Sequence, residues 1–307
     1  MHASPPPGLL ADELAPLLAG TPYRPLRLIG KGGMGEVYEI EHEFLGRHFA
    51  FKVMHPFLAR DAQFADRMRI EAQVTGRLRH PAAVEVIDFW VAAGRPCIVM
   101  ELLRGRSLAQ ELRERIRLPT LEAVQIGIEA LSALHAAHAV GVVHRDIKPE
   151  NLFLHELPSG RELKILDFGL ARIVPRLALD TPPTLLVPTA TGAMVGTPRF
   201  MSPEAERGRR VDTRADLYSL GVVLYVALAG HAPFDEDAGP AEPPSTYMSE
   251  GAPLAFDAVI LKAIAERIED RYQTAEEFRN ALLPFTPRKA GLPLANCRRA
   301  HAERESP

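Results

Sequence analysis

The pattern of apolar and polar positions divides the chain into two parts. Between residues 23 and 102, short apolar runs bounded by turn residues predict strands, and the charged segment 61–79, with apolar residues at helical spacing, predicts one helix among them. From Ser107, which forms a capping-box pattern with Gln110, the spacing becomes helical. Further helices are expected over 120–139, 212–230, 257–266 and 274–283. The order predicts an α+β protein, with an antiparallel sheet first and a mainly helical part after it.

Segments of low periodicity separate and flank these elements. Residues 1–22 are rich in Pro and Ala and are predicted to be a flexible lead with one short helix at 11–18. Two stretches, 175–195 and 235–253, are rich in Pro and lack periodicity, so both are predicted to be long loops. The end, 285–307, has little to bury and is predicted to be disordered.

Composition narrows the class of protein. The 307 residues are 47% hydrophobic and 24% charged, as in an ordinary globular protein, and the net charge of -3 favours neither nucleic acid nor an anionic membrane as partner. Cys97 and Cys297 are too far apart for a metal or redox motif, which indicates a reducing compartment. The most apolar segment, 217–229, is shorter than the roughly 20 residues that span a bilayer. We therefore expect a cytoplasmic protein without a membrane span in this chain.

A glycine-rich turn lies between the first two strand-like runs. Gly30, Gly32 and Gly35 would let the backbone approach phosphate oxygens and donate N–H groups to them. Because a strand follows the turn, a dinucleotide-binding βαβ unit is disfavoured. Lys52 lies in the next apolar strand, either as an edge lysine that reaches water or as a cation for phosphates, with Glu71 available as its carboxylate partner.

The segment 143–152 brings together residues suited to phosphoryl transfer. Within six positions it holds Asp146, Lys148 and Asn151, and Asp167 follows a later apolar run. Phosphoryl transfer needs a group that orients the attacking hydroxyl, cations for the oxygens and ligands for Mg²⁺. Carboxylate and amide oxygens are such ligands. Each residue alone could be a helix cap or a solvated turn residue, but their joint presence in this order favours the catalytic interpretation.

Together with Ser202-Pro203-Glu204, these motifs resemble the eukaryotic-like protein kinase family over residues 23–284. The resemblance implies a bilobal fold with an N-lobe at 23–100, a hinge at 101–106 and a C-lobe at 107–284. It also implies ATP as a substrate, Mg²⁺ as the metal with Mn²⁺ as an alternative, and proteins as the other substrates. No pattern supports dimerisation, which the sequence leaves open.

The resemblance assigns a role to each motif residue. Lys52 would pair with Glu71 and the α/β-phosphates, Asp146 would orient the hydroxyl, and Lys148 would steady the γ-phosphate. Asn151 and Asp167 would hold the metal. The residues expected to enclose adenine are Ile29, Val37, Ala50, Met100 as gatekeeper, and Phe153, with backbone hydrogen bonds from Glu101 and Leu103.

Other residues would support or regulate the site. Glu204 would pair with Arg271, and Asp216 would brace the catalytic loop. Lys148 and the segment 196–201, which includes Thr197, resemble the Ser/Thr branch, where Thr197 would contact Asp146. Thr189 and Thr191 are the expected autophosphorylation sites, since Arg145 precedes the catalytic aspartate and could pair with a phosphate.

One departure from the family concerns substrate recognition. The segment 235–256 is short and proline-rich where the family has a helix that docks protein substrates, so that helix is expected to be shortened or lost. Two alternatives remain: a kinase-shaped scaffold, and a small-molecule kinase with a similar Asp, Asn and Asp core. The first usually lacks one of the residues Lys52, Asp146 and Asp167; the second lacks the framework of Glu204, Asp216 and Arg271.

Overall fold

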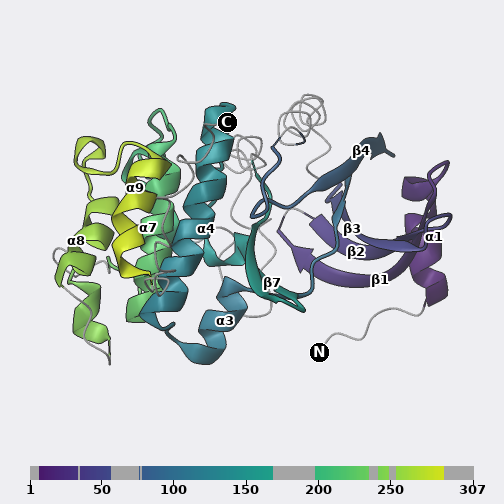
Figure 1. Ribbon diagram of the computed structural model, residues 1–307. Coiled ribbons are helices and arrows are strands. Elements are labelled where there is room, and N and C mark those ends of the chain that lie inside the picture. The colour runs from purple at the N-terminus through teal and green to yellow at the C-terminus, as the bar shows by residue number, and fades with distance from the viewer. Residues whose placement is uncertain are drawn as a thin grey trace, which may run out of the picture.

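The computed structural model describes residues 7–33, 35–56, 76, 78–168, 198–234, 241–248 and 254–286. Two lobes lie side by side in Figure 1, a sheet-rich lobe drawn in purple and blue and a helical lobe in teal to yellow. The strands of the first lobe are β1 (Tyr23–Gly32), β2 (Gly35–His42), β3 (Arg47–Met54), β4 (Val86–Ala92) and β5 (Arg95–Glu101).

The N-lobe is built on one antiparallel sheet, as the sequence predicts. The strand order is β1-β2-β3-β5-β4, and every pair of neighbours is antiparallel. Strand β3 lies in the middle, and its residues from Phe49 to Met54 are all buried. This explains why the segment reads as a continuous apolar run rather than an alternating one. The predicted helix at 61–79 lies almost entirely outside the described residues.

The helix before the sheet is a packed element. Helix α1 (Pro7–Leu18) lies against the sheet on the side away from the helical lobe (Figure 1). Leu14, Leu17 and Leu18 are buried with side chains of the sheet, and Trp90 Nε1 donates a hydrogen bond of 2.9 Å to Leu17 O. The short helix expected at 11–18 is therefore present and starts earlier, and it is packed rather than flexible because leucines at i, i+3 and i+4 give it an apolar face.

We expect Leu14→Ala to lower the free energy of unfolding by about 3 kcal/mol, since it removes a buried side chain and leaves a cavity. Leu14 is 1% exposed. Urea denaturation followed by circular dichroism measures the effect. Asp12→Ala, on the exposed face of the same helix, serves as the control and should change stability by less than about 0.5 kcal/mol. Equal stability of the two variants would contradict the packing of α1.

The C-lobe combines a small sheet with a helical core. The sheet contains β6 (Gly105–Ser107), β7 (Leu152–Leu157) and β8 (Gly160–Ile165), in that order. The main helices are α3 (Leu108–Arg115), α4 (Thr120–Ala139), α6 (Pro203–Glu206), α7 (Arg214–Ala229), α8 (Leu254–Ala263) and α9 (Ala275–Leu282). The Ser107 capping box at the start of α3 is present. Helices were therefore expected in the right places, with boundaries shifted by a few residues.

Helix α7 forms the centre of the C-lobe. All but two of its residues are buried, and helices α4 and α8 pack against it. Gly127 of α4 lies so close to Leu224 and Leu282 that a Cβ there would be 2.9 Å from the Leu282 Cδ1 atom. The apolar run 217–229 is thus a core helix. Among the described helices, none has both the length and the apolar character needed to cross a membrane.

The segment between α7 and α8 is described only at 241–248. It forms a short 3₁₀ turn, Pro244–Tyr247, that is tied to both helices: Tyr225 Oη donates to Glu242 O at 3.0 Å, and Ser245 Oγ donates to an Asp257 oxygen at 2.5 Å. No α-helix occurs within these eight residues. The expected shortening or loss of a docking helix in the rest of 235–256 stays a prediction. The predicted tail lies outside the described residues from 287 onward.

Candidate active site

A cavity between the lobes collects the residues expected to enclose adenine. Its lining comprises Ile29, Val37, Ala50, Lys52, Val84, Met100, Glu101, Leu102, Leu103, Phe153, Leu166 and Asp167. The structure thus brings together every residue of the expected adenine pocket. Sequence reasoning missed Val84, Leu102 and Leu166, although each adjoins a predicted strand or motif. A mostly apolar lining with few polar groups is typical of a small-molecule site.

The glycine-rich turn is a β-hairpin over this cavity. Gly32 pairs with Gly35 at its tip, and Gly30 pairs with Val37; Met34 lies outside the described residues. At Gly35 a Cβ would be 2.1 Å from Val53 O of β3, so the close packing of two strands requires glycine there. A Cβ added at Gly30 or Gly32 would meet no described atom closer than 3.8 Å. Packing within the described residues therefore does not by itself require glycine at these two positions.

Lys52 of β3 forms an ion pair across the cavity. Its Nζ lies 2.6 Å from Asp167 Oδ2, and the lysine is 7% exposed. A buried ammonium is stable only next to a carboxylate. Glu71, the partner expected from the family, lies outside the described residues. The Lys52–Asp167 pair joins the phosphate-binding candidate to the metal-binding candidate.

The carboxylate of Asp146 is held by two neighbours in its own loop. Lys148 Nζ donates to Oδ1 at 2.9 Å and lies 2.8 Å from Oδ2. Asn151 Nδ2 donates to Asp146 O at 2.7 Å and to Oδ2 at 2.9 Å. The carboxylate therefore has a fixed orientation, and its negative charge is compensated by one adjacent cation.

A fully buried aspartate fixes the backbone of this loop. Asp216 of α7 accepts hydrogen bonds from His144 N (2.8 Å) and Arg145 N (2.7 Å), and His138 Nε2 lies 2.8 Å from Oδ2. Arg145 has φ of 66°, a left-handed conformation that is unfavourable for a residue with a Cβ. Asp216 stabilises that conformation through the two backbone bonds. The contribution of His138 was not foreseen, because its spacing only marks a helix face.

The ring of His144 connects the loop with the strand end that carries Asp167. Nε2 donates to Leu166 O at 2.8 Å, and Nδ1 accepts a hydrogen bond from Asp146 N at 3.2 Å. Because one nitrogen accepts, the imidazole is neutral with its proton on Nε2. The ring also packs edge-on against Phe168, with centroids 4.9 Å apart. The positions of Asp146 and Asp167 are thereby linked.

Glu204 and Arg271 form a buried ion pair below the site. Two parallel bonds of 3.0 and 2.9 Å join them, and Arg271 also lies over the Tyr218 ring, 4.6 Å from its centroid. Burial raises the pKa of Glu204, but the hydrogen bonds from Arg271, a backbone hydrogen bond and the positive charge of Arg271 together hold that pKa below its usual value. This pair was expected from the family.

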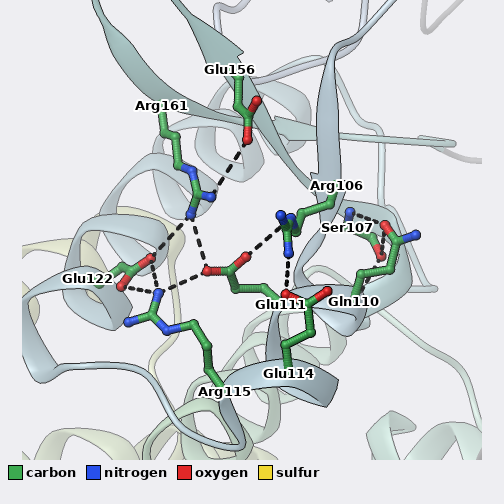
Figure 2. A network of polar contacts seen from close by, with 9 residues as sticks. All are labelled: Arg106, Ser107, Gln110, Glu111, Glu114, Arg115, Glu122, Glu156 and Arg161. Atoms are coloured by element: carbon green, nitrogen blue, oxygen red, sulfur yellow. Dashed lines mark hydrogen bonds and ion pairs between the residues drawn. The ribbon is translucent and has the colours of Figure 1, made fainter.

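A polar network fixes α3 beside the strand that follows the hinge. Figure 2 shows the buried Glu111 carboxylate facing Arg106 of β6, Arg115 of α3 and Arg161 of β8. Burial raises the pKa of Glu111, but the hydrogen bonds from Arg115 and Arg161 outweigh it, so that its pKa is lowered. The ionised carboxylate joins three elements, and sequence reasoning did not single out any of these residues.

The three threonines proposed for regulation, Thr189, Thr191 and Thr197, lie outside the described residues.

Comparisons with known proteins identify the family. Residues 23–289 match the family model for a protein kinase domain. The chain is 36% identical over 276 residues to serine/threonine-protein kinase pkn2 of Myxococcus xanthus, covering 85% of this chain and 32% of that protein. It is 39% identical over 269 residues to serine/threonine-protein kinase PknB of Mycobacterium leprae, covering 83% and 42%.

A solved structure supports the same assignment. The kinase domain of PknI from Mycobacterium tuberculosis superposes with a TM-score of 0.68 at 29% identity, covering 86% of this chain and 96% of that one. The chain spans between about a third and a half of the length of the curated relatives given above. The predicted bilobal α+β fold is confirmed. The chain belongs to the protein kinase family, in its eukaryotic-like branch of bacterial serine/threonine kinases.

Proposed function

We propose that this chain transfers the γ-phosphoryl group of ATP to serine or threonine hydroxyls of proteins, in bacterial signalling. The observation that supports this most is the Asp146 carboxylate, held by Lys148 and Asn151 and linked through His144 to the strand that carries Asp167. A scaffold without activity would have no need of this arrangement.

ATP would bind in the cavity in one orientation. Adenine would lie among the apolar side chains under Val37 and over Phe153, with the backbone of Glu101 and Leu103 as hydrogen-bonding edge. The phosphates would then lie under the glycine hairpin beside Lys52, whose ammonium would bind the α- and β-phosphates. The hinge, the hairpin and the lysine line the same cavity, which supports this orientation.

The donor set also fits a magnesium ion, with manganese as an alternative. Asp167 and Asn151 offer hard oxygen ligands, as Mg²⁺ prefers. Asn151 uses its Nδ2 for both bonds to Asp146, which leaves the amide oxygen as its ligand atom. The bound metal would neutralise charge on the β- and γ-phosphates.

The transfer step follows from the geometry of the loop. The substrate hydroxyl donates a hydrogen bond to Asp146, which orients its oxygen toward the γ-phosphorus and accepts its proton. The new bond forms between the hydroxyl oxygen and phosphorus, while the bond to the bridging β–γ oxygen breaks and ADP leaves. Lys148 stabilises the charge on the transferred group, as a positioned cation does. Because the reaction consumes ATP, we place the domain in the cytoplasm.

Labelled ATP tests the proposal. Purified protein with Mg²⁺ or Mn²⁺ and a generic basic protein should yield labelled phosphoserine and phosphothreonine after acid hydrolysis. Labelled phosphotyrosine, or transfer to an aminoglycoside in place of protein, would assign another substrate class. Absence of any transfer with either metal would favour a scaffold.

Regulatory phosphorylation of the proline-rich segment 175–195, which holds Thr189 and Thr191, is a separate proposal. Thr189 and Thr191 precede Thr197, and a phosphate there could pair with the exposed Arg145 beside Asp146. We expect Thr189→Ala/Thr191→Ala to lower activity about tenfold, measured by initial rates after preincubation with ATP. The same rate in the double variant and in the unaltered protein would exclude these two sites.

A further inference from the structure

We propose that the side chains of Glu101 and Lys164 are a positioning pair that sets the spacing between the hinge and the floor of the adenine pocket. The expected role of Glu101 concerns its backbone only, and Lys164 has no expected role. This inference rests on the proposed binding of ATP in the cavity. It concerns affinity for the nucleotide, separately from the transfer step.

The two side chains make a close, largely dehydrated contact. Lys164 Nζ donates to Glu101 Oε1 at 2.9 Å and to Oε2 at 3.1 Å. Lys164 is only 8% exposed, and the next carboxylate, Glu162, is farther away at 3.7 Å. Such a buried ammonium depends on its carboxylate partner, so Glu101 and Lys164 are strongly coupled.

The carboxylate of Glu101 also binds the N-lobe. Glu85 N donates to Glu101 Oε1 at 2.9 Å, and Glu101 N donates to Glu85 O at 3.0 Å. The hinge residue is therefore tied on one side to the segment that leads into β4. Its remaining interaction is with β8 of the C-lobe. One carboxylate thus joins the two lobes at the edge of the cavity.

Lys164 places this contact at the pocket floor. In the antiparallel pair of β7 and β8, Lys164 lies directly opposite Phe153, so both side chains are on the same face of the small sheet. Phe153 lines the cavity below the adenine position. Movement of Lys164 away from the hinge would therefore move the floor away from the adenine edge.

A second contact beside this pair keeps the strands in register. Val84 N donates to Ile165 O at 3.1 Å, and Ile165 N donates to Ala82 O at 2.8 Å. These backbone bonds join the lobes whatever side chains are present. Loss of the ion pair should therefore alter the pocket locally while the lobes stay together, which separates a positioning role from a general loss of folding.

The test uses the full chain and Mg·ADP binding by calorimetry, with KM for ATP and kcat as kinetic readouts. We expect Glu101→Gln and Lys164→Met each to weaken Mg·ADP binding and to raise KM by about tenfold, with kcat within about threefold. Lys164→Arg should restore most of the affinity because it keeps the charge. Lys262→Met removes an exposed lysine that pairs with Glu277 in the C-lobe and serves as the control without effect.

The double variant Glu101→Gln/Lys164→Met decides whether the pair acts as a unit. Its affinity should equal that of the weaker single variant, since the second change removes nothing further. Effects of the two changes that multiply, or Mg·ADP affinities within twofold of the unaltered protein, would overturn the inference. Mg·ADP binding is measured independently of phosphoryl transfer. If the variants weaken Mg·ADP binding as expected but the unaltered protein transfers no phosphate, the result counts against the proposed function and not against this pair.

Discussion

Asp146→Asn is expected to reduce kcat by about 10²- to 10⁴-fold, the range for loss of a positioned acid–base group. The amide keeps the shape of the side chain and can still accept the hydrogen bond from Asn151 Nδ2. It loses the charge that orients and deprotonates the hydroxyl, and it leaves Lys148 without its ion pair. KM for ATP should change little, because no atom of Asp146 lines the adenine cavity.

The measurement is the initial rate of labelled phosphate transfer at saturating ATP, accompanied by a thermal melt. Asp212→Asn provides a matched control: Asp212 also pairs with a cation two residues later, Arg214, but at an exposed position. That variant should keep its activity. A kcat of Asp146→Asn within about tenfold of the unaltered protein would remove Asp146 from the proposed mechanism.

The contacts among Asp146, Lys148 and Asn151 could be predicted from sequence because these residues are neighbours in the chain. Asp146, Lys148 and Asn151 lie within six positions, so a local motif is enough to bring their atoms together. Asp167 was singled out by the order of the motifs, but its position beside Asp146 depends on the β7–β8 hairpin, which returns the chain to the same place. The residues expected to enclose adenine came from the family resemblance; of the lining residues that were missed, Leu102 and Leu166 adjoin expected residues and Val84 does not.

The long-range pair of Glu204 and Arg271 was expected only through the family resemblance, and two other long-range ion pairs were not predicted. Glu111 with Arg161, and Glu101 with Lys164, join elements far apart in sequence, and isolated charged residues give no signal about which partner they choose. Helix α1 shows a different failure. The helix itself was predicted at 11–18, but a composition rich in Pro and Ala favoured a flexible lead over a helix packed on the sheet. The helix is held in place by packing against side chains of the N-lobe sheet, and that contact could be known only from the folded structure.

The buried pair of Glu204 and Arg271 should carry the largest effect on stability. Arg271→Met removes one partner and leaves the carboxylate buried without its cation, which costs about 3–5 kcal/mol of unfolding free energy. The melting temperature should fall by about 10 °C. Arg271 is 1% exposed and also donates to Ala265 O and Glu266 O, so three acceptors lose their donor. Arg207→Met, which breaks the exposed pair with Glu266, should cost less than about 1 kcal/mol.

The pH dependence distinguishes this mechanism from lost packing. In the unaltered protein the pKa of Glu204 is lower in the folded than in the unfolded state. Its contribution to stability is therefore complete above the unfolded pKa, near 4.5, and is lost as pH falls through the lowered folded pKa. In Arg271→Met the unpaired, buried carboxyl should have a raised pKa, so acid neutralises it and relieves the cost. The difference in unfolding free energy between the two proteins should thus shrink between pH 7 and pH 4, measured by urea denaturation. A difference independent of pH would mean that lost packing, and not the uncompensated charge, destabilises the variant.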